Sequence, residues 1–188
     1  MSRKEMDVIL RSSLTVFSFR DIELLIRETK PGLLRRRLNY YVKKGELYSP
    51  RRGIYTKSKD YNLFEFGVKL YAPAYLSFET VLASSGVVFQ RHQTITLASY
   101  LSRVLNADGY EYHYRKMTEK IVFNPTGLVA KSGYSAACPE RAVLDMLYIN
   151  IDSSFDNLKG LDRGKLKEIS GIYENSRLEN KLAVLLRR

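Results

Sequence analysis

Residues 29–45 read TKPGLLRRRLNYYVKKG, and the pattern of this stretch decides the fold predicted for the first part of the chain. Pro31 suits the first turn of a helix, because its missing N–H would be unpaired there anyway. Gly45 suits the position just after a helix, where a left-handed backbone is common. At about 100° per residue, one side of this helix collects the apolar side chains Leu34, Leu38, Tyr41 and Val42. We therefore expect a helix through LLRRRLNYYVKK that ends at Gly45 and buries this stripe.

The remaining side chains of this helix are basic, aromatic and amide in character. Arg36, Tyr40 and Lys43 lie opposite the apolar stripe, where they suit base edges or phosphates of DNA. The flanking arginines suit phosphate contacts, which give affinity but little sequence information. The candidate DNA-binding residues of this segment are Lys30, Arg35, Arg36, Arg37, Asn39, Tyr40, Lys43 and Lys44. The alternative is a small helical core with a solvated basic face.

The neighbouring segments complete the pattern of a winged helix-turn-helix. Residues 3–12 read as a first helix, and residues 18–21 resemble a capping box that opens a second helix. After the third helix, two short apolar strands surround the turn PRRG at residues 50–53, which predicts a hairpin. Arg51 and Arg52 at its tip are further candidate DNA-binding residues, suited to phosphate. In such proteins the third helix lies in the major groove.

The charge of the chain is concentrated in the same part. The 188 residues include 31 Lys and Arg against 20 Asp and Glu, which gives a formal net charge of +11. Residues 1–60 hold 15 basic and 7 acidic side chains, whereas residues 61–188 hold 16 and 13. A local surplus of this kind indicates a polyanionic partner, most often nucleic acid, although an inert solubilising surface would have the same composition. We therefore expect double-stranded DNA as a partner.

Composition excludes several classes of protein. With 45% hydrophobic residues the chain can bury a sizeable core, so it is not a disordered protein. No run approaches the roughly 20 apolar residues needed to span a bilayer, and the N-terminus MSRKEMDVILRSS lacks the apolar stretch of a signal peptide. The single cysteine, Cys138, has no partner for an internal disulfide. These features predict a cytoplasmic protein with no membrane partner.

A short polar segment at residues 56–60 predicts a division into residues 1–58 and residues 59–188. The second part mixes helical and strand patterns, so the expected fold class is α+β, with a small mixed α/β C-terminal domain built on a short antiparallel sheet and flanking helices. Expected strands or extended segments are 93–97, 109–114, 120–123, 127–130 and 134–138. Expected helices follow Ser77 and Pro139, and two more lie in the tail, the last opening with a capping box at Ser176.

No catalytic arrangement is found, and we expect neither an enzyme nor a cofactor or metal site. The chain has no phosphate-binding glycine loop, no zinc-protease motif and no nucleophile elbow. His92 and His113 are far apart and more typical of ordinary packed or surface histidines. Cys138 starts a helix, where a thiol pKa can fall, but a small buried residue is the favoured interpretation.

Two further groups of residues leave alternatives open. The three tyrosines among residues 110–114 could stack on nucleotides, but packing of a sheet face on helices is favoured. Glu140, Arg141 and Asp145 are the polar members of an otherwise apolar helix. Arg141 and Asp145 are four residues apart and close enough to pair. Pairing or capping is therefore favoured over a role in partner binding or between domains.

Three segments resemble one known family. The segment YLSFETVLASSG at residues 75–86 resembles the YLSFESALSYHGL block of AbiEi-type abortive-infection antitoxins. The segment ACPERAVLDMLY at residues 137–148 resembles their ATPEKALLDLLYL block, and the region ending in RRGIY at residues 51–55 is similar to their N-terminal domain. The resemblance covers roughly residues 5–150. One departure is Cys138, where the family usually has Thr or Ser.

The resemblance implies an antitoxin that binds inverted repeats in its own promoter through a winged helix. It also implies that the second part counteracts a cognate AbiEii-type nucleotidyltransferase toxin, without requiring a stable complex. By position, Arg36, Tyr40, Arg51 and Arg52 would serve DNA, and the helix at residues 139–148 would belong to the antitoxin domain. The alternatives are a stand-alone winged-helix regulator whose second part binds a ligand or partner, and a nucleic-acid enzyme.

Overall fold

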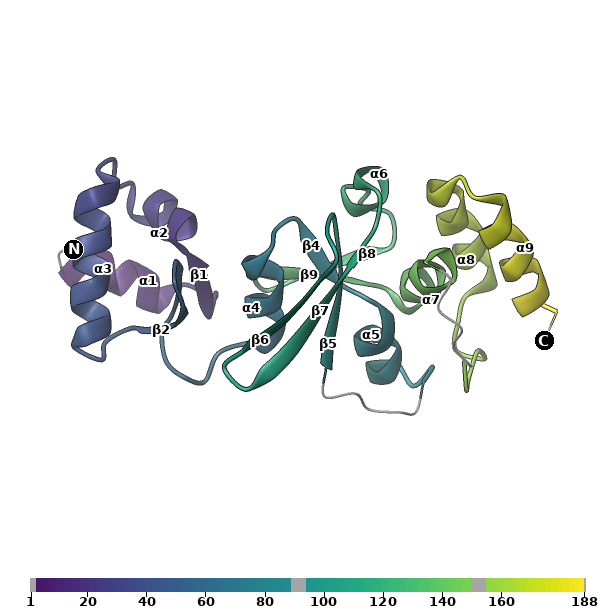
Figure 1. Ribbon diagram of the computed structural model, residues 1–188, viewed down its shortest axis with the longest axis horizontal. Coiled ribbons are helices and arrows are strands. Elements are labelled where there is room, and N and C mark those ends of the chain that lie inside the picture. Colours follow the sequence, from purple (N-terminus) through teal and green to yellow (C-terminus); the bar gives the residue numbers. More distant parts are fainter. Residues whose placement is uncertain (1–2, 89–93, 150–154, 188) are drawn as a thin grey trace.

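The computed structural model describes residues 3–88, 94–149 and 155–187, and it combines helices with two β-sheets of three and six strands (Figure 1). The first part of the chain, drawn in purple and blue at one end of the molecule, contains the three-stranded sheet. The six-stranded sheet occupies the middle, and the last helices lie at the opposite end. The predicted α+β class is confirmed.

The first part begins with helices and ends in a hairpin. Its elements are α1 (Arg3–Arg11), β1 (Val16–Ser18), α2 (Phe19–Ile26), α3 (Pro31–Lys43), β2 (Tyr48–Arg51) and β3 (Ile54–Thr56). As predicted, α3 has Pro31 in its first turn, and Gly45 follows it with a φ of 74°. The capping box of α2 is also confirmed, because Ser18 accepts the Asp21 N–H at 3.1 Å while the Asp21 carboxylate accepts the Ser18 N–H at 2.8 Å.

A small apolar core holds these elements together. It consists of Met6, Ile9, Phe17, Ile22, Leu34, Leu38, Leu47 and Tyr55. The sheet has the order β1-β3-β2, with both pairs antiparallel, so the predicted hairpin is observed. The sequence did not predict β1, because three residues are too few to show the alternation of a strand.

The second part alternates strands and helices along the chain. Its elements are α4 (Leu63–Leu70), β4 (Ala74–Leu76), α5 (Phe78–Ser84), β5 (Thr94–Ser99), β6 (Arg103–Ala107), β7 (Tyr110–Lys116), α6 (Glu119–Val122), β8 (Leu128–Lys131), β9 (Tyr134–Ala137), α7 (Pro139–Tyr148), α8 (Arg163–Ser170), a 3-10 turn (Gly171–Tyr173) and α9 (Ser176–Leu185). Gln93, the first residue of one expected strand, lies outside the described residues. No helix in the described part of the chain has the length and apolarity needed to cross a membrane.

The prediction of an antiparallel sheet is wrong. The strand order is β6-β7-β5-β4-β9-β8, and β5 runs parallel to β7 while β4 runs parallel to β9. Strand β7 lies inside the sheet because it pairs with β6 on one side and with β5 on the other. Its Tyr112 and Tyr114 are buried, and the Tyr114 hydroxyl donates to the Gly67 carbonyl of α4 at 2.6 Å. Packing is therefore confirmed for these two tyrosines, whereas Tyr110 is exposed. Alternation identifies a half-buried strand but not its neighbours.

Residues 120–123, expected as a strand, instead lie in and just after the helical turn α6. The adjacent side chains of Ile121 and Val122 are both buried. A strand would direct them to opposite faces, whereas a helical turn allows both to reach the core. The Thr118 carbonyl accepts the first N–H bonds of this turn.

The last helix begins one residue away from its predicted cap. The side-chain oxygen of Asn175 accepts the Leu178 N–H at 3.1 Å, so Asn175 is the N-cap of α9. Ser176, predicted to cap the helix, is its first helical residue. Asn and Ser are equally good caps, so composition alone did not decide between two adjacent candidates.

Apolar and polar contacts join the two parts of the chain. Val16 and Ile54 of the three-stranded sheet belong to the larger core of the second part. At the turn between β6 and β7, the Asp108 carboxylate accepts hydrogen bonds from the Tyr48 and Tyr61 hydroxyls at 3.1 and 2.7 Å. The division near residue 58 stays a prediction, since side chains pack across it.

Helix α4 supplies two further contacts between the parts. A Glu65 carboxylate oxygen accepts the N–H and the hydroxyl of Thr15 at 2.9 and 2.7 Å, and Glu65 is buried. Lys69 pairs with Asp21 at 2.6 Å. Burial acts to raise the pKa of Asp21, but the bonds from Lys69 and from the Ser18 backbone outweigh it and lower the pKa. Asp21 therefore both caps α2 and anchors it to α4.

Candidate nucleic-acid interface

The polar side of α3 points away from the core of the first part. Leu34 and Leu38 are fully buried, and Arg36, Tyr40 and Lys43 on the opposite side are exposed. Tyr40 is 52% exposed, so about half of this side chain is open to solvent. The predicted helical phase is therefore confirmed, with a basic and aromatic face open to solvent.

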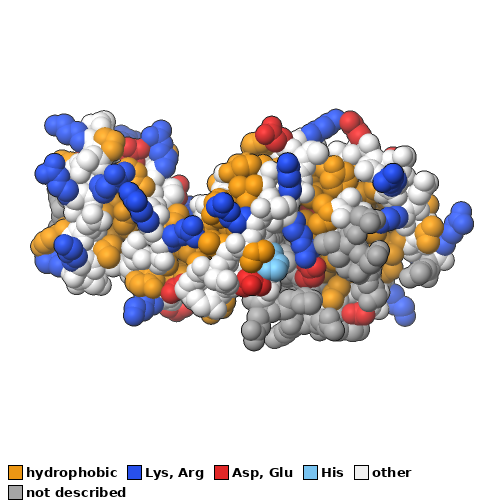
Figure 2. Space-filling view, viewed as in Figure 1, with side chains coloured by type: hydrophobic (Ala, Val, Ile, Leu, Met, Phe, Trp, Pro, Cys, Tyr) orange, Lys and Arg blue, Asp and Glu red, His pale blue; other side chains and the backbone are white. Residues whose placement is uncertain are grey.

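Several cations of this region form no ion pair with the acidic side chains that the structure describes. Within the described part of the chain, no side-chain ion pair is formed by Lys30, Arg36, Lys43 or Arg52. Figure 2 shows Lys and Arg side chains spread over the surface of this part, with few acidic groups among them on that face. Asn39 is exposed as well. Uncompensated positive charge on one element creates a potential that attracts polyanions.

Arg35 and Arg37 have different surroundings from these cations. The Arg37 guanidinium lies 3.0 Å from the Glu28 carboxylate and 3.7 Å from that of Glu5, so it links α3 to α1 and to the turn after α2. The guanidinium carbon of Arg35 lies 5.6 Å from the centre of the Phe19 ring. Arg37 is thus already paired within the fold, whereas Arg35 stays exposed beside the start of α2.

The end of α3 places a cation over an exposed aromatic ring. The Lys44 ammonium lies 5.0 Å from the centre of the Tyr40 ring, and Tyr40 contacts Tyr41 edge-on at 5.4 Å. Interaction with Tyr40 raises the pKa of Lys44. Lys44 also lies 3.8 Å from Glu46, a distance typical of a weak surface pair. Tyr40 is therefore held in one orientation with its ring exposed.

The two arginines of the hairpin lie in different environments. The turn consists of Arg52 and Gly53. The φ of the second position is 83°, a backbone conformation that favours glycine. The Gly53 carbonyl accepts the Phe19 N–H at 2.9 Å, which fixes the turn against the start of α2. Arg52 is exposed, whereas Arg51 is half-buried, and its charge helps to lower the pKa of Tyr71 in the second part, after the larger effect of Arg103. The hairpin tip therefore presents one free arginine and one that faces the second part.

One arginine near this hairpin was not predicted. Arg103, the first residue of β6, is exposed and donates a 2.7 Å hydrogen bond to the Tyr71 hydroxyl. Arg51, Tyr71 and Arg103 are separated by 20 and 32 residues, and nothing in their local sequence connects them. Only the packing of β6 beside α4 and the hairpin brings them together.

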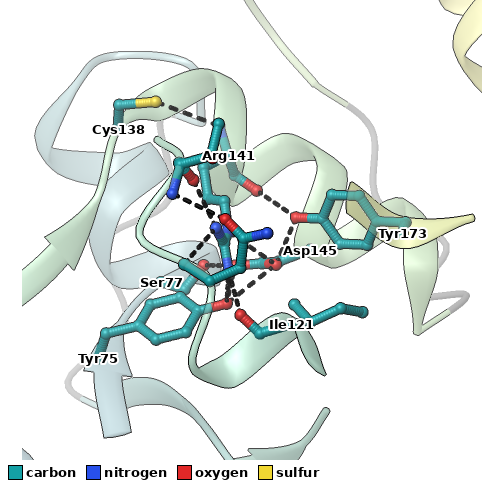
Figure 3. A network of polar contacts seen from close by, with 9 residues as sticks. Tyr75, Ser77, Ile121, Cys138, Arg141, Asp145 and Tyr173 are labelled. Carbon is teal, nitrogen blue, oxygen red and sulfur yellow. Dashed lines mark hydrogen bonds and ion pairs between the residues drawn. The ribbon is translucent and has the colours of Figure 1, made fainter. Parts of the chain in front are cut away.

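The polar residues of α7 form a buried network (Figure 3). Arg141 and Asp145 are fully buried and lie 3.7 Å apart, so the predicted pairing is confirmed. Three hydroxyl groups donate to the Asp145 carboxylate: Ser77 at 2.6 Å, Tyr173 at 2.6 Å and Tyr75 at 3.1 Å. The network therefore ties α7 to β4, to the start of α5 and to the 3-10 turn.

Arg141 makes further bonds to the backbone around α6. Its guanidinium donates to the carbonyls of Ile121 at 2.7 Å and Asn124 at 3.1 Å, and also to that of Thr126. It donates to the Tyr75 hydroxyl at 3.0 Å as well. These carbonyls belong to a segment with little regular structure, so Arg141 supplies the donors that a sheet or helix would otherwise provide.

The groups with possible chemistry show no catalytic arrangement in the described residues. The sulfur of Cys138 accepts the Arg141 N–H at 3.4 Å and caps α7, and burial raises the pKa of this thiol. His113 lies 2.8 Å from Glu111, and His92 is outside the described residues. No group of three or more metal-ligating side chains is found among the residues described. Cys138 thus has a structural role here.

The two segments that resemble AbiEi-type antitoxins meet in the buried network. Tyr75 and Ser77 come from the first segment, and Arg141 and Asp145 come from the second. Helices α5 and α7, which contain most of both segments, pack against each other. No protein-family model matches the chain, and no curated protein is significantly similar to it. The resemblance therefore stays an interpretation of these sequence blocks.

Proposed function

We propose that this protein is a DNA-binding transcriptional repressor and antitoxin, whose first part is a winged helix that binds inverted repeats in its own promoter. The order helix, strand, two helices and hairpin supports this proposal, with α3 as the recognition helix and β2–β3 as the wing. The observation that carries it is the exposed face of α3, where Arg36, Tyr40 and Lys43 lie opposite a fully buried stripe.

The size of this face fits one groove of a duplex. A helix with its side chains is about 10–12 Å across, close to the roughly 12 Å width of the major groove. Arg36 and Lys43, seven residues apart, lie about 10 Å from each other along its exposed side. The hairpin extends the cationic surface with Arg52. Phosphate contacts by such groups supply affinity that falls steeply as salt rises.

A binding experiment with the full chain tests this proposal. A duplex is first selected from a random-sequence library by the wild-type protein, and binding is then measured by fluorescence anisotropy at two salt concentrations. We expect Arg36→Gln and Lys43→Gln to weaken binding by about 10-fold each. Arg177→Gln, which removes the same charge from exposed α9, is the matched control and should change binding less than about twofold. A flat salt response, or equal effects of all three variants, would overturn the proposal.

The antitoxin activity requires its own experiment. We propose that the second part counteracts an AbiEii-type nucleotidyltransferase toxin, on the strength of the resemblance at residues 75–86 and 137–148. Co-expression with such a toxin encoded beside this chain should restore growth, and Arg36→Gln should restore it equally well because toxin relief does not need DNA. Growth arrest that persists when the wild-type chain is present would contradict this part of the proposal.

A pocket supports a second candidate, a regulator whose second part binds a ligand. A mainly apolar pocket of about 280 Å³ lies between α5 and the β8–β9 hairpin, with Leu76, Val81 and Val129 among its lining residues. This is close to the lower limit for small-molecule sites. A small apolar ligand should raise the unfolding temperature of the wild-type chain, and Val129→Trp should abolish that rise. No ligand effect in a broad screen would leave the antitoxin proposal as the better one.

A further inference from the structure

Two arginines converge on one tyrosine where the hairpin of the first part meets the second part. Arg103 donates to the Tyr71 hydroxyl at 2.7 Å, and its guanidinium carbon lies 5.2 Å from the centre of the Tyr71 ring. Arg51, at the end of β2, is close enough to Tyr71 for its charge to act on the same hydroxyl. Both arginines, Arg103 more strongly, lower the pKa of Tyr71. Tyr71 in turn rests edge-on against Tyr114 at 5.0 Å, so its position is fixed by the sheet.

The charge at this position is not compensated. In the described residues, no carboxylate forms an ion pair with Arg51 or Arg103. Arg115 of the neighbouring strand shows the contrast, because it makes two 2.8 Å bonds to the Glu79 carboxylate. Two guanidinium groups that approach one atom repel each other unless an anion lies between them.

The groups at this position are almost all donors. Each guanidinium has five N–H donors and no acceptor, and Arg103 uses only part of this capacity on Tyr71. Since the Tyr71 oxygen accepts the bond from Arg103, its own O–H is left to donate. A set of N–H and O–H donors around a fixed ring matches the oxygens of a phosphate group, which arginine binds with good geometry.

We propose that Arg51, Arg103 and the Tyr71 hydroxyl form a phosphate-binding site between the two parts of the chain. The inference rests on the proposed function for its occupant, a backbone phosphate of the bound duplex beside the hairpin. The second part then contributes directly to DNA affinity through β6. Because the two arginines come from different parts, DNA binding also stabilises the observed arrangement of those parts.

Full-length Arg103→Gln tests the site, with Arg177→Gln as the control for loss of one charge. Arg103 is exposed at the start of an edge strand, so the variant should fold, and thermal unfolding checks this. With the selected duplex, we expect Arg103→Gln to weaken binding about 3- to 10-fold and to reduce the slope of log affinity against log salt by about one. Tyr71→Phe, which keeps the ring, should cause a smaller loss, and Arg103→Lys should recover part of the affinity.

A titration with inorganic phosphate separates the two sources of the ligand. Side-chain NMR signals of the arginines are followed, and Arg51 and Arg103 should shift in the wild type while Arg177 does not. Shifts with phosphate but unchanged duplex affinity in Arg103→Gln would assign the site to a free phosphate compound and overturn the duplex as its occupant. Unchanged duplex affinity and no shifts would overturn the site altogether. If the wild type binds no duplex, the proposed function fails, and the phosphate titration alone decides the site.

Discussion

Replacing Arg141 with Met should destabilise the protein strongly. The side chain is fully buried and lies 3.7 Å from the equally buried Asp145 carboxylate. The substitution leaves that carboxylate without its cation, and it removes the guanidinium donors of the Asn124 and Thr126 carbonyls. Breaking a buried pair from one side costs about 3–5 kcal/mol. The remaining donors to Asp145, including the Ser77 hydroxyl at 2.6 Å, keep the loss within that range.

Urea unfolding followed by circular dichroism measures this loss. Thermal unfolding gives a second measure: in a chain of 188 residues each kcal/mol corresponds to about 2–4 °C in Tm, so we expect Tm to fall by about 6–20 °C. The double variant Arg141→Met with Asp145→Leu should be more stable than the single variant by about 1 kcal/mol or more, because it removes the unpaired carboxylate. Arg177→Met, on exposed α9, is the control and should stay within about 0.5 kcal/mol of the wild type.

The single variant Arg141→Met and the double variant together show whether the Arg141–Asp145 network stabilises the fold. If Arg141→Met costs less than about 1 kcal/mol, the pair does not stabilise the fold in the way the geometry indicates. If the double variant loses as much as the two single variants together, the two charges do not interact. Either result would refute the reasoning. Duplex binding measured well below the Tm should be unchanged in all stable variants, because the network lies far from α3 in the fold (Figure 1).

Three other predictions follow from the geometry. Gly127→Ala should lower the free energy of unfolding by about 1–3 kcal/mol, because Gly127 has a φ of 75° and a Cβ there would lie 2.9 Å from the side chain of Ile169. An unchanged midpoint of urea unfolding would contradict this prediction. Asp21 has a lowered pKa in the folded protein, so the ionised carboxylate stabilises the fold above about pH 4, and this stabilisation is lost as the pH falls through the folded pKa. The difference in stability between the wild type and Asp21→Asn should therefore shrink in acid. A difference independent of pH would exclude the Lys69 pair as its source. Leu38→Ala should cost about 2–5 kcal/mol in the same unfolding assay, and a cost below about 1 kcal/mol would mean that α3 is not held by its buried stripe.

The first part of the chain was predictable because its signals are local. The period of α3, the proline at its start and the glycine after it all lie within 17 consecutive residues. The capping box of α2 spans four. Helix α4 has a local signal of the same kind, the N-cap residue Asn62, although the helix was not predicted. The Asn62 side chain accepts the N–H groups of Phe64 and Glu65 and so begins the helix.

The second part was less predictable because its sheet depends on distant pairings. Strand β4 lies beside β9, which follows it by about 60 residues, and the two run parallel. Side-chain alternation in each strand carries no information on which partner it has or in which direction. The same limitation applies to the site of Arg51, Tyr71 and Arg103, because each of these residues is ordinary in its own segment and their meeting depends on tertiary packing.

The two segments that resemble AbiEi-type antitoxins, residues 75–86 and 137–148, lie mainly in the interior of the second part. Three polar residues that both blocks share with the family, Tyr75, Ser77 and Asp145, are buried in one network, so they determine how β4, α5 and α7 pack and are inaccessible to DNA or to another protein. A resemblance carried by buried residues therefore supports a common fold more strongly than a common activity. The proposed DNA-binding activity depends instead on exposed residues, which are those on the face of α3, in the hairpin and at Arg103. Variants on those surfaces test function, whereas variants of Arg141 and Asp145 test only the fold on which it is built.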